Sequence, residues 1–180
     1  MSGFSRGLTI VVVFLVGIPL GFMAMLWALD LVGEGPMRNL ALDKRTQQSS
    51  LYDNSEKSQP GGGVDGIING SYGFSTAHEA KPWWQVDLGS LLVVREIRVH
   101  NRTECCRERA KSLLVLVSAD GKSWRQVYSH AGKAPFGSKT TGDPLMIRLP
   151  SSQKARYVRV QLGEPNYLHL DEIEVFGPGR

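Results

Sequence analysis

Residues 83–100 read WWQVDLGSLLVVREIRVH, and this stretch decides the fold class. Trp83–Leu88 and Leu92–His100 are rich in aromatic, β-branched and other apolar residues, and each run has the length of a strand. From Glu96 onward apolar and polar residues alternate, as in a strand with one buried face. Neighbouring residues of a strand face opposite sides, so we expect at most one of Trp83 and Trp84 in the core and a packing role for both.

The chain that follows residue 39 continues this pattern. Further strand-length runs lie at Ser112–Ser118, Ser123–Tyr128, Leu145–Leu149, Arg156–Leu162 and Leu168–Phe176. Asp120 and Gly121 form a turn signal between the first two of these runs. No apolar pattern of helical period and length occurs in this part of the sequence. The pattern therefore predicts an all-β fold, an antiparallel sandwich or jelly roll of two sheets.

The composition is that of a folded globular protein with one domain. The chain has 180 residues, of which 42% are hydrophobic and 21% are charged, and its formal net charge is +4. Basic residues are interspersed with acidic ones, and no basic tract with interleaved aromatic residues occurs. This distribution argues against nucleic-acid binding.

An uncharged, largely apolar run of 22 residues, Leu8–Leu29, lies near the amino terminus. About 20 apolar residues cross the hydrocarbon core of a bilayer. A cleavable signal peptide normally has a shorter apolar region, of roughly 7–15 residues. We therefore expect residues 8–29 to be an uncleaved, single-pass transmembrane signal anchor, with residues 1–7 as a short cytoplasmic tail and residues 30–38 as a linker.

Both cysteines of the chain are adjacent, within the segment Asn101–Arg109 (NRTECCRER). A bond between them would close a small ring, because adjacent Cα atoms are only about 3.8 Å apart across a trans peptide, against roughly 4.4–6.8 Å in most disulfides. The exposed sulfur atoms would form a polarizable surface. Arg102 and Arg109 could then direct planar donor groups at one ligand from either side of Cys105 and Cys106. This pattern favours a sugar site.

Other interpretations of the cysteine pair stay open at this point. Two free cysteines that serve only as packing residues are one alternative. A zinc site is disfavoured, because zinc takes about four ligands and the neighbours here are Arg and Glu. A bonded pair requires an oxidising compartment. We therefore expect the globular part on the extracytoplasmic side of the membrane, extracellular or periplasmic.

Several motifs resemble, in their order along the chain, those of the fucolectins. These are the F-type lectins, within the discoidin-like (galactose-binding-like) group of coagulation factor V/VIII C-type β-sandwiches. The motifs are Asn39–Leu42 with Gln47–Ser50, Val64–Gly66, Pro82–Gly89, Asn101–Cys106 and Leu170–Gly177. The resemblance covers about residues 39–177, with residues 178–180 as a tail. It implies an eight-stranded jelly roll, a structural calcium ion, and binding of L-fucose or a related sugar at one end of the sandwich.

The sugar motif of that family is a histidine, an arginine 27 residues later, an acidic residue two further on, and a second basic residue seven after the first arginine. Arg102, Glu104 and Arg109 match the last three positions. Counting back 27 residues from Arg102 reaches Ser75 instead of a histidine, and the nearest histidine is His78 in the same loop. The sugar site implied by the resemblance comprises Arg102, Glu104, Cys105, Cys106, Arg109, His78 and Ser75. The arginines would donate hydrogen bonds to the sugar, Glu104 would orient an arginine, and the disulfide would support the methyl face.

The resemblance also implies the ligands of the calcium ion. Asp65 and Glu172 fall where the family has carboxylate ligands, and backbone carbonyls around Gly62, Ile67 and Asp171 would complete the oxygen shell. Calcium takes 6–8 oxygen ligands, many of them carbonyls. Without the resemblance, Asp65 would belong to a simple turn and Glu172 would be a solvated strand residue.

Binding is favoured over catalysis. The sequence has no Ser-His-Asp set, no metal-ligand cluster and no glycine-rich phosphate loop, so we do not expect an enzyme. We expect a membrane-anchored lectin that binds glycans, and clustered copies in the membrane would strengthen binding by multivalency. The alternative is a discoidin-like adhesion or scaffold module that binds a protein partner or a phospholipid and has a vestigial sugar site, which Ser75 at the histidine position would indicate. Phe74 and Phe136 are the apolar loop residues that a phospholipid could contact.

Overall fold

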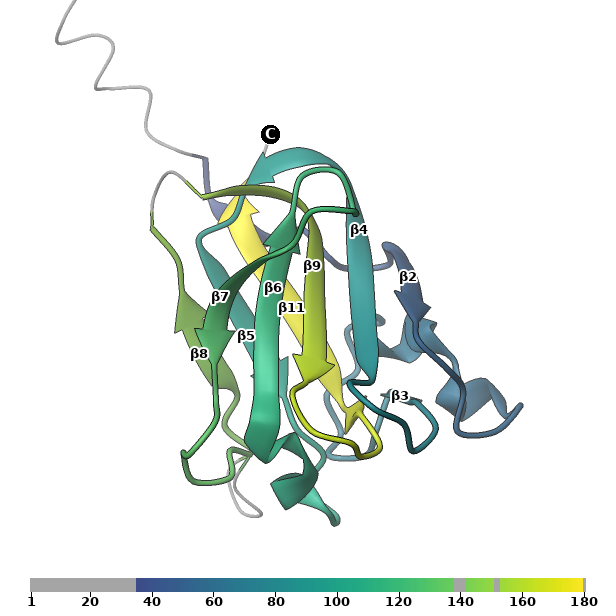
Figure 1. Ribbon diagram of the computed structural model, residues 1–180. Helices are drawn as coiled ribbons and strands as arrows, with labels where there is room; N and C mark the ends of the chain where they lie inside the picture. The colour runs from purple at the N-terminus through teal and green to yellow at the C-terminus, as the bar shows by residue number, and fades with distance from the viewer. Residues whose placement is uncertain (1–34, 138–141, 151–152, 180) are drawn as a thin grey trace, which may run out of the picture. The chain divides into compact units, whose positions relative to one another are not determined.

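The fold is seen in a computed structural model, which describes residues 35–137, 142–150 and 153–179. Two antiparallel sheets form a sandwich, and Figure 1 shows them as layers, with β4, β6 and β9 in front of β5 and β11. The first sheet has the order β1 (Met37–Asn39), β11 (Glu172–Pro178), β5 (Glu96–His100), β8 (Leu145–Arg148). The second has the order β2 (Arg45–Gln48), β4 (Trp83–Val93), β9 (Lys154–Leu162), β6 (Leu113–Ser118), β7 (Arg125–Ser129). The predicted all-β sandwich is confirmed.

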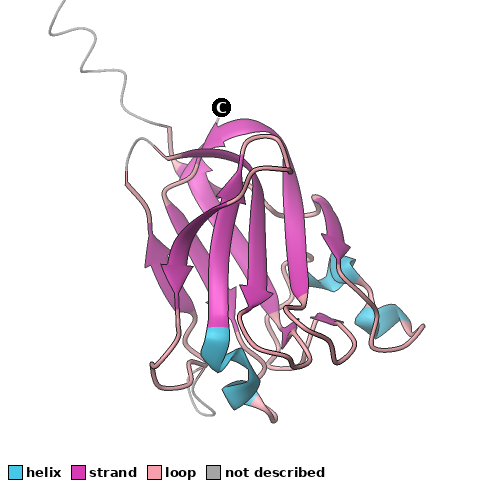
Figure 2. Cartoon of the chain, viewed as in Figure 1, coloured by secondary structure: helices cyan, strands magenta, loops and turns pink. Residues whose placement is uncertain are grey.

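The remaining elements gather at one end of the sandwich. Two short strands, β3 (Phe74–Ser75) and β10 (His169–Leu170), pair with each other outside both large sheets. Three short 3₁₀ helices are η1 (Glu56–Ser58), η2 (Pro60–Gly63) and η3 (Arg107–Ser112). Figure 2 shows the helices and several long loops at this end. The described residues thus contain eleven strands, more than the eight that the resemblance implies.

The boundary between β4 and β5 differs from the prediction. Leu92 continues β4 instead of beginning the next strand, and β5 begins at Glu96. The register of β4 against β9 shifts between Asp87 and Leu92. At this shift the Asp87 carboxylate accepts a hydrogen bond of 2.8 Å from the Gly89 N–H, and Gly89 has a φ of +85°. A bulge of this kind lets one strand continue through a turn-like sequence.

The predicted strand at residues 168–176 is also divided. It separates at Asp171 into β10, which pairs with β3, and β11, which pairs with β1 and β5. The Asp171 N–H donates to the His100 carbonyl at 2.9 Å, where the chain passes from the small pair into the large sheet. A continuous apolar sequence does not reveal such a change of partner strand.

Trp84 lies in the core between the sheets. Because neighbouring residues of a strand face opposite sides, only one of Trp83 and Trp84 can do so. Trp84 is fully buried, its ring stacks on Phe74 with centroids 5.3 Å apart, and its Nε1 donates to the Pro60 carbonyl at 2.9 Å. Trp83 lies on the outer face, where the Arg159 guanidinium sits 4.3 Å from its ring centre. Phe74 is therefore a core residue, and its assignment as an exposed loop residue that could contact lipid is wrong.

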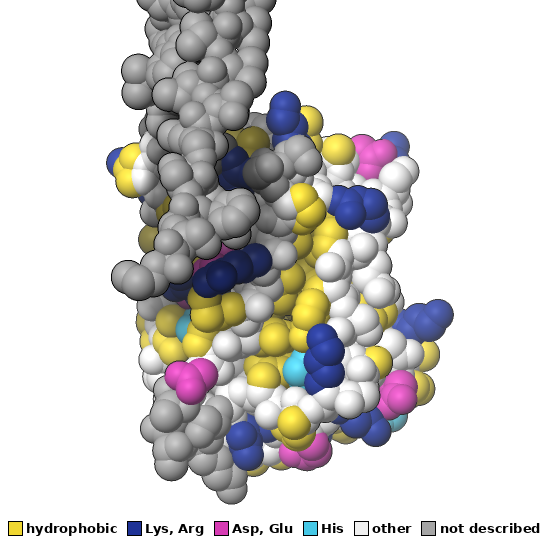
Figure 3. Space-filling model, turned by 90° about the vertical axis from the view of Figure 1, so that its left-hand side faces the viewer, with side chains coloured by type: hydrophobic (Ala, Val, Ile, Leu, Met, Phe, Trp, Pro, Cys, Tyr) yellow, Lys and Arg dark blue, Asp and Glu magenta, His cyan; other side chains and the backbone are white. Residues whose placement is uncertain are grey.

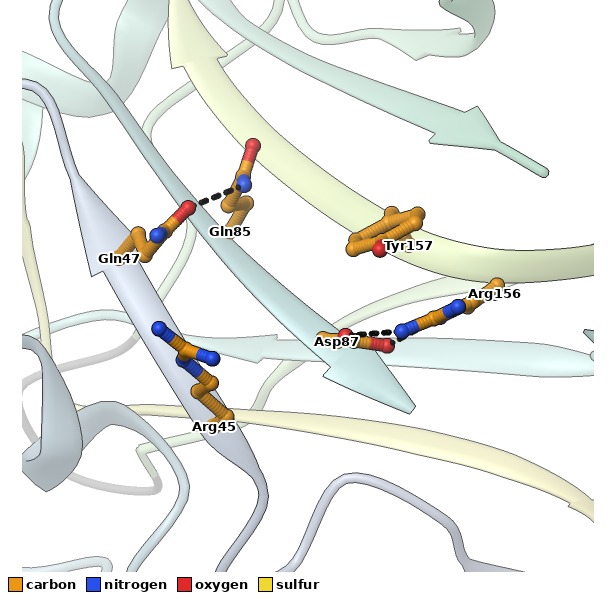
Figure 4. A pocket seen from close by; sticks show the side chains of 6 residues that line it. All are labelled: Arg45, Gln47, Gln85, Asp87, Arg156 and Tyr157. Atoms are coloured by element: carbon orange, nitrogen blue, oxygen red, sulfur yellow. Dashed lines mark hydrogen bonds and ion pairs between the residues drawn. The ribbon is translucent and has the colours of Figure 1, made fainter. Parts of the chain in front are cut away.

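A shallow pocket of about 220 Å³ lies on the outer face of the five-stranded sheet (Figure 4). Most of its polar groups are paired across strands. Arg156 donates two hydrogen bonds of 2.8 Å to Asp87, which hold the pKa of that carboxyl below its usual range. Gln85 donates to Gln47 at 2.9 Å. These pairs connect neighbouring strands, and Figure 4 shows no dashed line at the other two lining residues, Arg45 and Tyr157.

Charged side chains are dispersed over the face that Figure 3 shows. A band of hydrophobic atoms runs along the middle of this face, with separate basic and acidic side chains around it. The described basic residues do not join into a continuous tract there. This agrees with the argument from sequence against nucleic-acid binding, which needs a basic stripe or patch.

The predicted transmembrane segment, residues 8–29, lies outside the described residues. In the part of the chain that the structure describes, no helix has the length and apolarity to cross a membrane. Met37 and Arg38, which the sequence assigns to the linker, pair with Pro178 and Gly177 as strand β1. The sheet therefore begins two residues before the predicted domain start at residue 39.

Replacing Trp84 with alanine should lower the free energy of unfolding by about 3–5 kcal/mol, because it leaves a large cavity in the core. The matched change Trp83→Ala should cost less, about 1–2 kcal/mol, since it removes a half-buried cation–π contact and leaves no cavity between the sheets. Urea unfolding of both variants measures the difference. Equal losses would contradict the placement of only one ring in the core.

Candidate functional site

The adjacent cysteines lie between β5 and β6, at the start of η3. The structure joins Cys105 and Cys106 by a disulfide. Cys106 adopts the left-handed conformation, with a φ of +59°, and caps η3. The Arg109 N–H donates to the Cys106 carbonyl at 3.1 Å. The pair therefore fixes where η3 begins and, with it, the position of Arg109.

A pocket of about 320 Å³ opens beside this disulfide. Both sulfur-bearing residues and the two arginines line it together with residues from distant parts of the chain. The lining residues are Tyr52, Tyr72, Ser75, Arg102, Cys105, Cys106, Arg109, Tyr167 and His169. The structure thus brings together Arg102, Arg109, the cysteine pair and Ser75, which the sequence assigns to a sugar site.

Arg102 is held by a carboxylate and an aromatic ring. Its Nη2 donates to the Glu104 Oε1 at 2.5 Å, and the Ser71 hydroxyl donates to the same oxygen at 3.2 Å. Its guanidinium lies 4.9 Å from the centre of the Tyr72 ring. Glu104 is outside the pocket lining, so in this structure it orients and neutralises Arg102.

Arg109 is held by uncharged groups instead. Its guanidinium lies 5.0 Å from the centre of the Tyr167 ring, and its Nη1 lies 3.3 Å from the His169 Nε2. Burial, together with the positive charges of Arg102 and Arg109, lowers the pKa of His169 to about 4. The imidazole is therefore neutral at pH 7, and Arg109 has no carboxylate partner in the described contacts.

The sequence analysis missed His169. It is 4% exposed and lies in β10 between Leu168 and Leu170, a run that predicts only a buried strand. The signal that identifies it is the pairing of β10 with β3, in which His169 is directly opposite Ser75. This pairing joins residues 94 positions apart in the sequence, so it is visible only in three dimensions.

Ser75 and His78 have different environments. Ser75 is buried in β3, and its hydroxyl donates to the Thr76 carbonyl at 3.3 Å. His78 is exposed, and its ring packs edge-on against Tyr167 with centroids 5.1 Å apart. His78 is not among the pocket-lining residues, so it supports the wall at Tyr167 from outside.

The predicted calcium ligands lie near this pocket. Glu172 is fully buried, its Oε1 accepts from the Gly66 N–H at 3.1 Å, and its Oε2 has no hydrogen-bond partner in the described part of the chain. Burial raises the pKa of Glu172 to about 8, and the negative charge of Asp65 contributes. A buried carboxylate oxygen without a partner is costly, so this position fits a cation.

Backbone oxygens converge beside the same loop. A Cβ atom placed on Gly73 would lie 2.0 Å from the Gly62 carbonyl oxygen and 2.4 Å from that of Asp171. A hollow at this point is also lined by Asp65 and Ile67. Among the described residues, no three or more His, Cys, Asp or Glu side chains form a metal-binding group. Carbonyls would therefore have to supply most of the shell, and calcium accepts such ligands.

Asp171 connects the two regions. Its Oδ2 accepts hydrogen bonds from the N–H groups of Asn69 at 3.1 Å and Gly70 at 2.7 Å, and burial raises the pKa of this carboxyl. The Gly70 carbonyl then accepts from the Thr103 N–H at 2.8 Å. The loop with the predicted calcium ligands is therefore bonded directly to the segment that carries Arg102 and the disulfide.

Comparison with known proteins identifies the domain. Residues 46–173 match the F5/8 type C domain. The chain belongs to this family. Fucolectin-1 of Anguilla japonica is 28% identical over 143 residues, which are 76% of this chain and 79% of that protein. The relatives of this F5/8 type C domain thus include lectins, as the resemblance implies.

Solved structures show the same fold. A fucolectin from the serum of Morone saxatilis matches with a TM-score of 0.68 at 27% identity, and the match covers 79% of this chain and about half, 49%, of that one. The lectin domain of lectinolysin, in complex with Lewis B antigen, matches with a TM-score of 0.63 at 28% identity, over 79% of this chain and 98% of that one. The discoidin-like fold of the F5/8 type C domain is confirmed.

Replacing Gly70 with alanine should destabilise the domain more than the matched change Gly89→Ala. Both glycines have positive φ, +82° and +85°, so both changes cost about 1–2 kcal/mol of backbone strain. At Gly70 the new Cβ would also lie 2.3 Å from the Thr103 Oγ1, whereas at Gly89 no atom lies within 4 Å. Urea unfolding of the two variants checks this, and equal losses would show that the contact between the two loops is not tight.

Proposed function

We propose that this F5/8 type C domain is a lectin module that binds fucose-type glycans and does not alter them. The observation that carries the proposal is the 320 Å³ pocket in which two guanidinium groups and a disulfide face the same space. Planar N–H donors suit the ring oxygen and hydroxyls of a sugar, and the sulfur surface suits a methyl or C–H face. The fucolectin names of the relatives support the choice of sugar.

Each group has a distinct task in this proposal. Arg102 and Arg109 donate hydrogen bonds to neighbouring sugar oxygens, and Glu104 keeps Arg102 in place. Cys105 and Cys106 form the apolar platform. The pocket is at the small end of the range for ligand sites, so it suits the terminal residue of a glycan rather than a long chain.

The lining of the pocket supports sugar binding rather than glycoside hydrolysis at this site. Glycoside hydrolysis needs two carboxyl groups held on either side of the scissile bond. No Asp or Glu is among the described residues that line this pocket, and the nearby Glu104 is hydrogen-bonded to Arg102. The proposed lectin therefore lacks the acid and base for that reaction at this site.

A structural calcium ion is part of the proposal. The carboxylates of Asp65 and Glu172 and the carbonyls of Gly62, Ile67 and Asp171 would hold it. The buried Glu172 Oε2 without a partner supports this assignment, because a cation would satisfy it and favour the ionised carboxylate. The ion would stabilise the loop at residues 61–77 beside the sugar site and would not contact the sugar.

The membrane anchor and the location also belong to the proposal. The apolar run at residues 8–29 would anchor the chain by a single span, with the lectin domain on the extracytoplasmic side. The adjacent cysteines support an oxidising location. Copies anchored in one membrane would engage several glycans together, which strengthens weak single-site binding.

Phe74 and Phe136, the two loop residues predicted to contact a phospholipid, both pack against the core. Phe74 is buried in the core, and Phe136 packs against the core with its ring 5.0 Å from His130. The pocket at the disulfide favours a sugar over a lipid, because its lining is largely polar and aromatic. Binding to a protein partner or to a phospholipid is the alternative to the lectin, and Ile67 and Ile68 are exposed apolar loop residues that could make such contacts.

L-fucose should bind to the full-length chain in a calorimetric titration, and Arg102→Ala should weaken the affinity by roughly 10- to 150-fold, since a hydrogen bond to a charged group contributes about 1.5–3 kcal/mol. Reduction of the disulfide should also weaken binding. Arg45→Ala, which alters the pocket on the sheet face, is the matched control and should bind as the parent does. If the parent protein binds no L-fucose at millimolar concentration while its fold is intact and its cysteines are bonded, the fucose assignment is refuted.

Calcium should stabilise the domain against heat. Calcium at about 100 times its dissociation constant adds about 2.7 kcal/mol to the unfolding free energy of a protein that binds it only when folded. We expect EDTA to lower the melting temperature, added Ca²⁺ to restore it, and Glu172→Gln to weaken the response. Scanning calorimetry measures the three states. The same melting temperature in EDTA and in excess Ca²⁺ would exclude the site.

A further inference from the structure

The short strand pair β3–β10 places two residues at one point of the pocket wall. Ser75 and His169 are direct partners in this antiparallel pair, and both line the pocket. Side chains of directly opposed residues project from the same face of the pair, with Cβ atoms about 4.5–5.5 Å apart. Either strand can therefore deliver a side chain to this position, and here β10 delivers the larger one.

The contact between His169 and Arg109 fixes the chemistry of the ring. The His169 Nε2 lies 3.3 Å from the Arg109 Nη1. A guanidinium has only donors, so this contact is a hydrogen bond when Nε2 accepts and the ring proton is on Nδ1, an atom that is buried without a partner among the described residues. The ring is 96% buried, since its exposed fraction is 4%, and this leaves it little freedom to turn. His169 is thus positioned to fix the orientation of the Arg109 guanidinium group.

The two arginines differ in the charge of their partners. Arg102 is bonded to the carboxylate of Glu104. Arg109 contacts an imidazole and the ring of Tyr167, neither of which carries a negative charge. The charge of Arg109 is consequently not balanced by a carboxylate in these contacts, and its remaining N–H groups are left for a ligand.

We propose that His169 is a positioning residue of this site, supplied by β10, which holds Arg109 through its Nε2 so that the free N–H groups of Arg109 meet adjacent oxygens of the sugar. This inference rests on the proposed lectin function. It also accounts for Ser75, whose small side chain leaves room for the imidazole from the opposite strand. A histidine is then present in the pocket although the position 27 residues before Arg102 holds a serine.

Two substitutions at one position separate acceptor chemistry from volume. His169→Leu fills the space without an acceptor, whereas His169→Gln retains an amide oxygen that can accept from Arg109. We expect L-fucose affinity of the full-length chain to fall about tenfold in His169→Leu and to fall much less in His169→Gln. Melting temperatures of the two variants should be similar. Parent-like affinity of His169→Leu, or equal losses in both variants, would overturn the proposal.

Exchange of the two partners gives an independent test. The double variant Ser75→His/His169→Ser moves the imidazole from β10 to β3 at the same level of the strand pair. It should recover most of the affinity that the single variant His169→Ser loses. A double variant that binds no better than His169→Ser, with an unchanged melting temperature, would show that the imidazole does not act from this point of the wall.

The failure of this inference can be told from the failure of the lectin function. The ¹⁵N NMR signals of the His169 ring in the sugar-free, full-length protein should show the neutral form protonated on Nδ1, and Arg109→Ala should change them. A ring protonated on Nε2 would overturn the positioning role whether or not sugar binds. Absence of L-fucose binding by the parent would instead refute the lectin function and, with it, the role of His169 toward a sugar.

Discussion

The buried carboxylate of Asp171 is the constraint on which both regions at the end of the sandwich depend. The carboxylate accepts hydrogen bonds from two backbone N–H groups of the loop at residues 69–70. The backbone N–H of Asp171 donates to the His100 carbonyl at the end of β5. A buried carboxylate with two backbone donors is satisfied, whereas the same group without them would be costly. The residue therefore joins a loop without regular structure to two strands of the sandwich, and this fixes the loop in space.

The position of the pocket follows from this arrangement. The Gly70 carbonyl accepts a hydrogen bond from the Thr103 N–H, and Glu104 and the disulfide follow Thr103 directly in the chain. The imidazole beside Arg109 comes from β10, which ends where Asp171 begins the crossing into β11. The segments that carry the arginines and the imidazole are thus joined by backbone hydrogen bonds close to Asp171, and a bound cation near Glu172 would stiffen the same loop.

The sequence predicts the sandwich well because alternation and turn signals are local. It also predicts the arginine pair, since both arginines flank an uncommon pair of adjacent cysteines. It does not predict His169 or the break at Asp171, because both depend on the pairing of β3 with β10 across many residues. The sequence also assigns Phe74 to a loop, because composition does not reveal its stacking on Trp84 in the core.

The claim that a sugar occupies the pocket beside the disulfide is tested most directly by an NMR titration of the isotope-labelled, full-length chain with L-fucose. The account predicts that backbone amide shifts concentrate at Arg102, Cys106, Arg109 and His169, with no change at Arg45 on the sheet face. Shifts confined to the sheet-face pocket, or no shifts at saturating sugar, would contradict it.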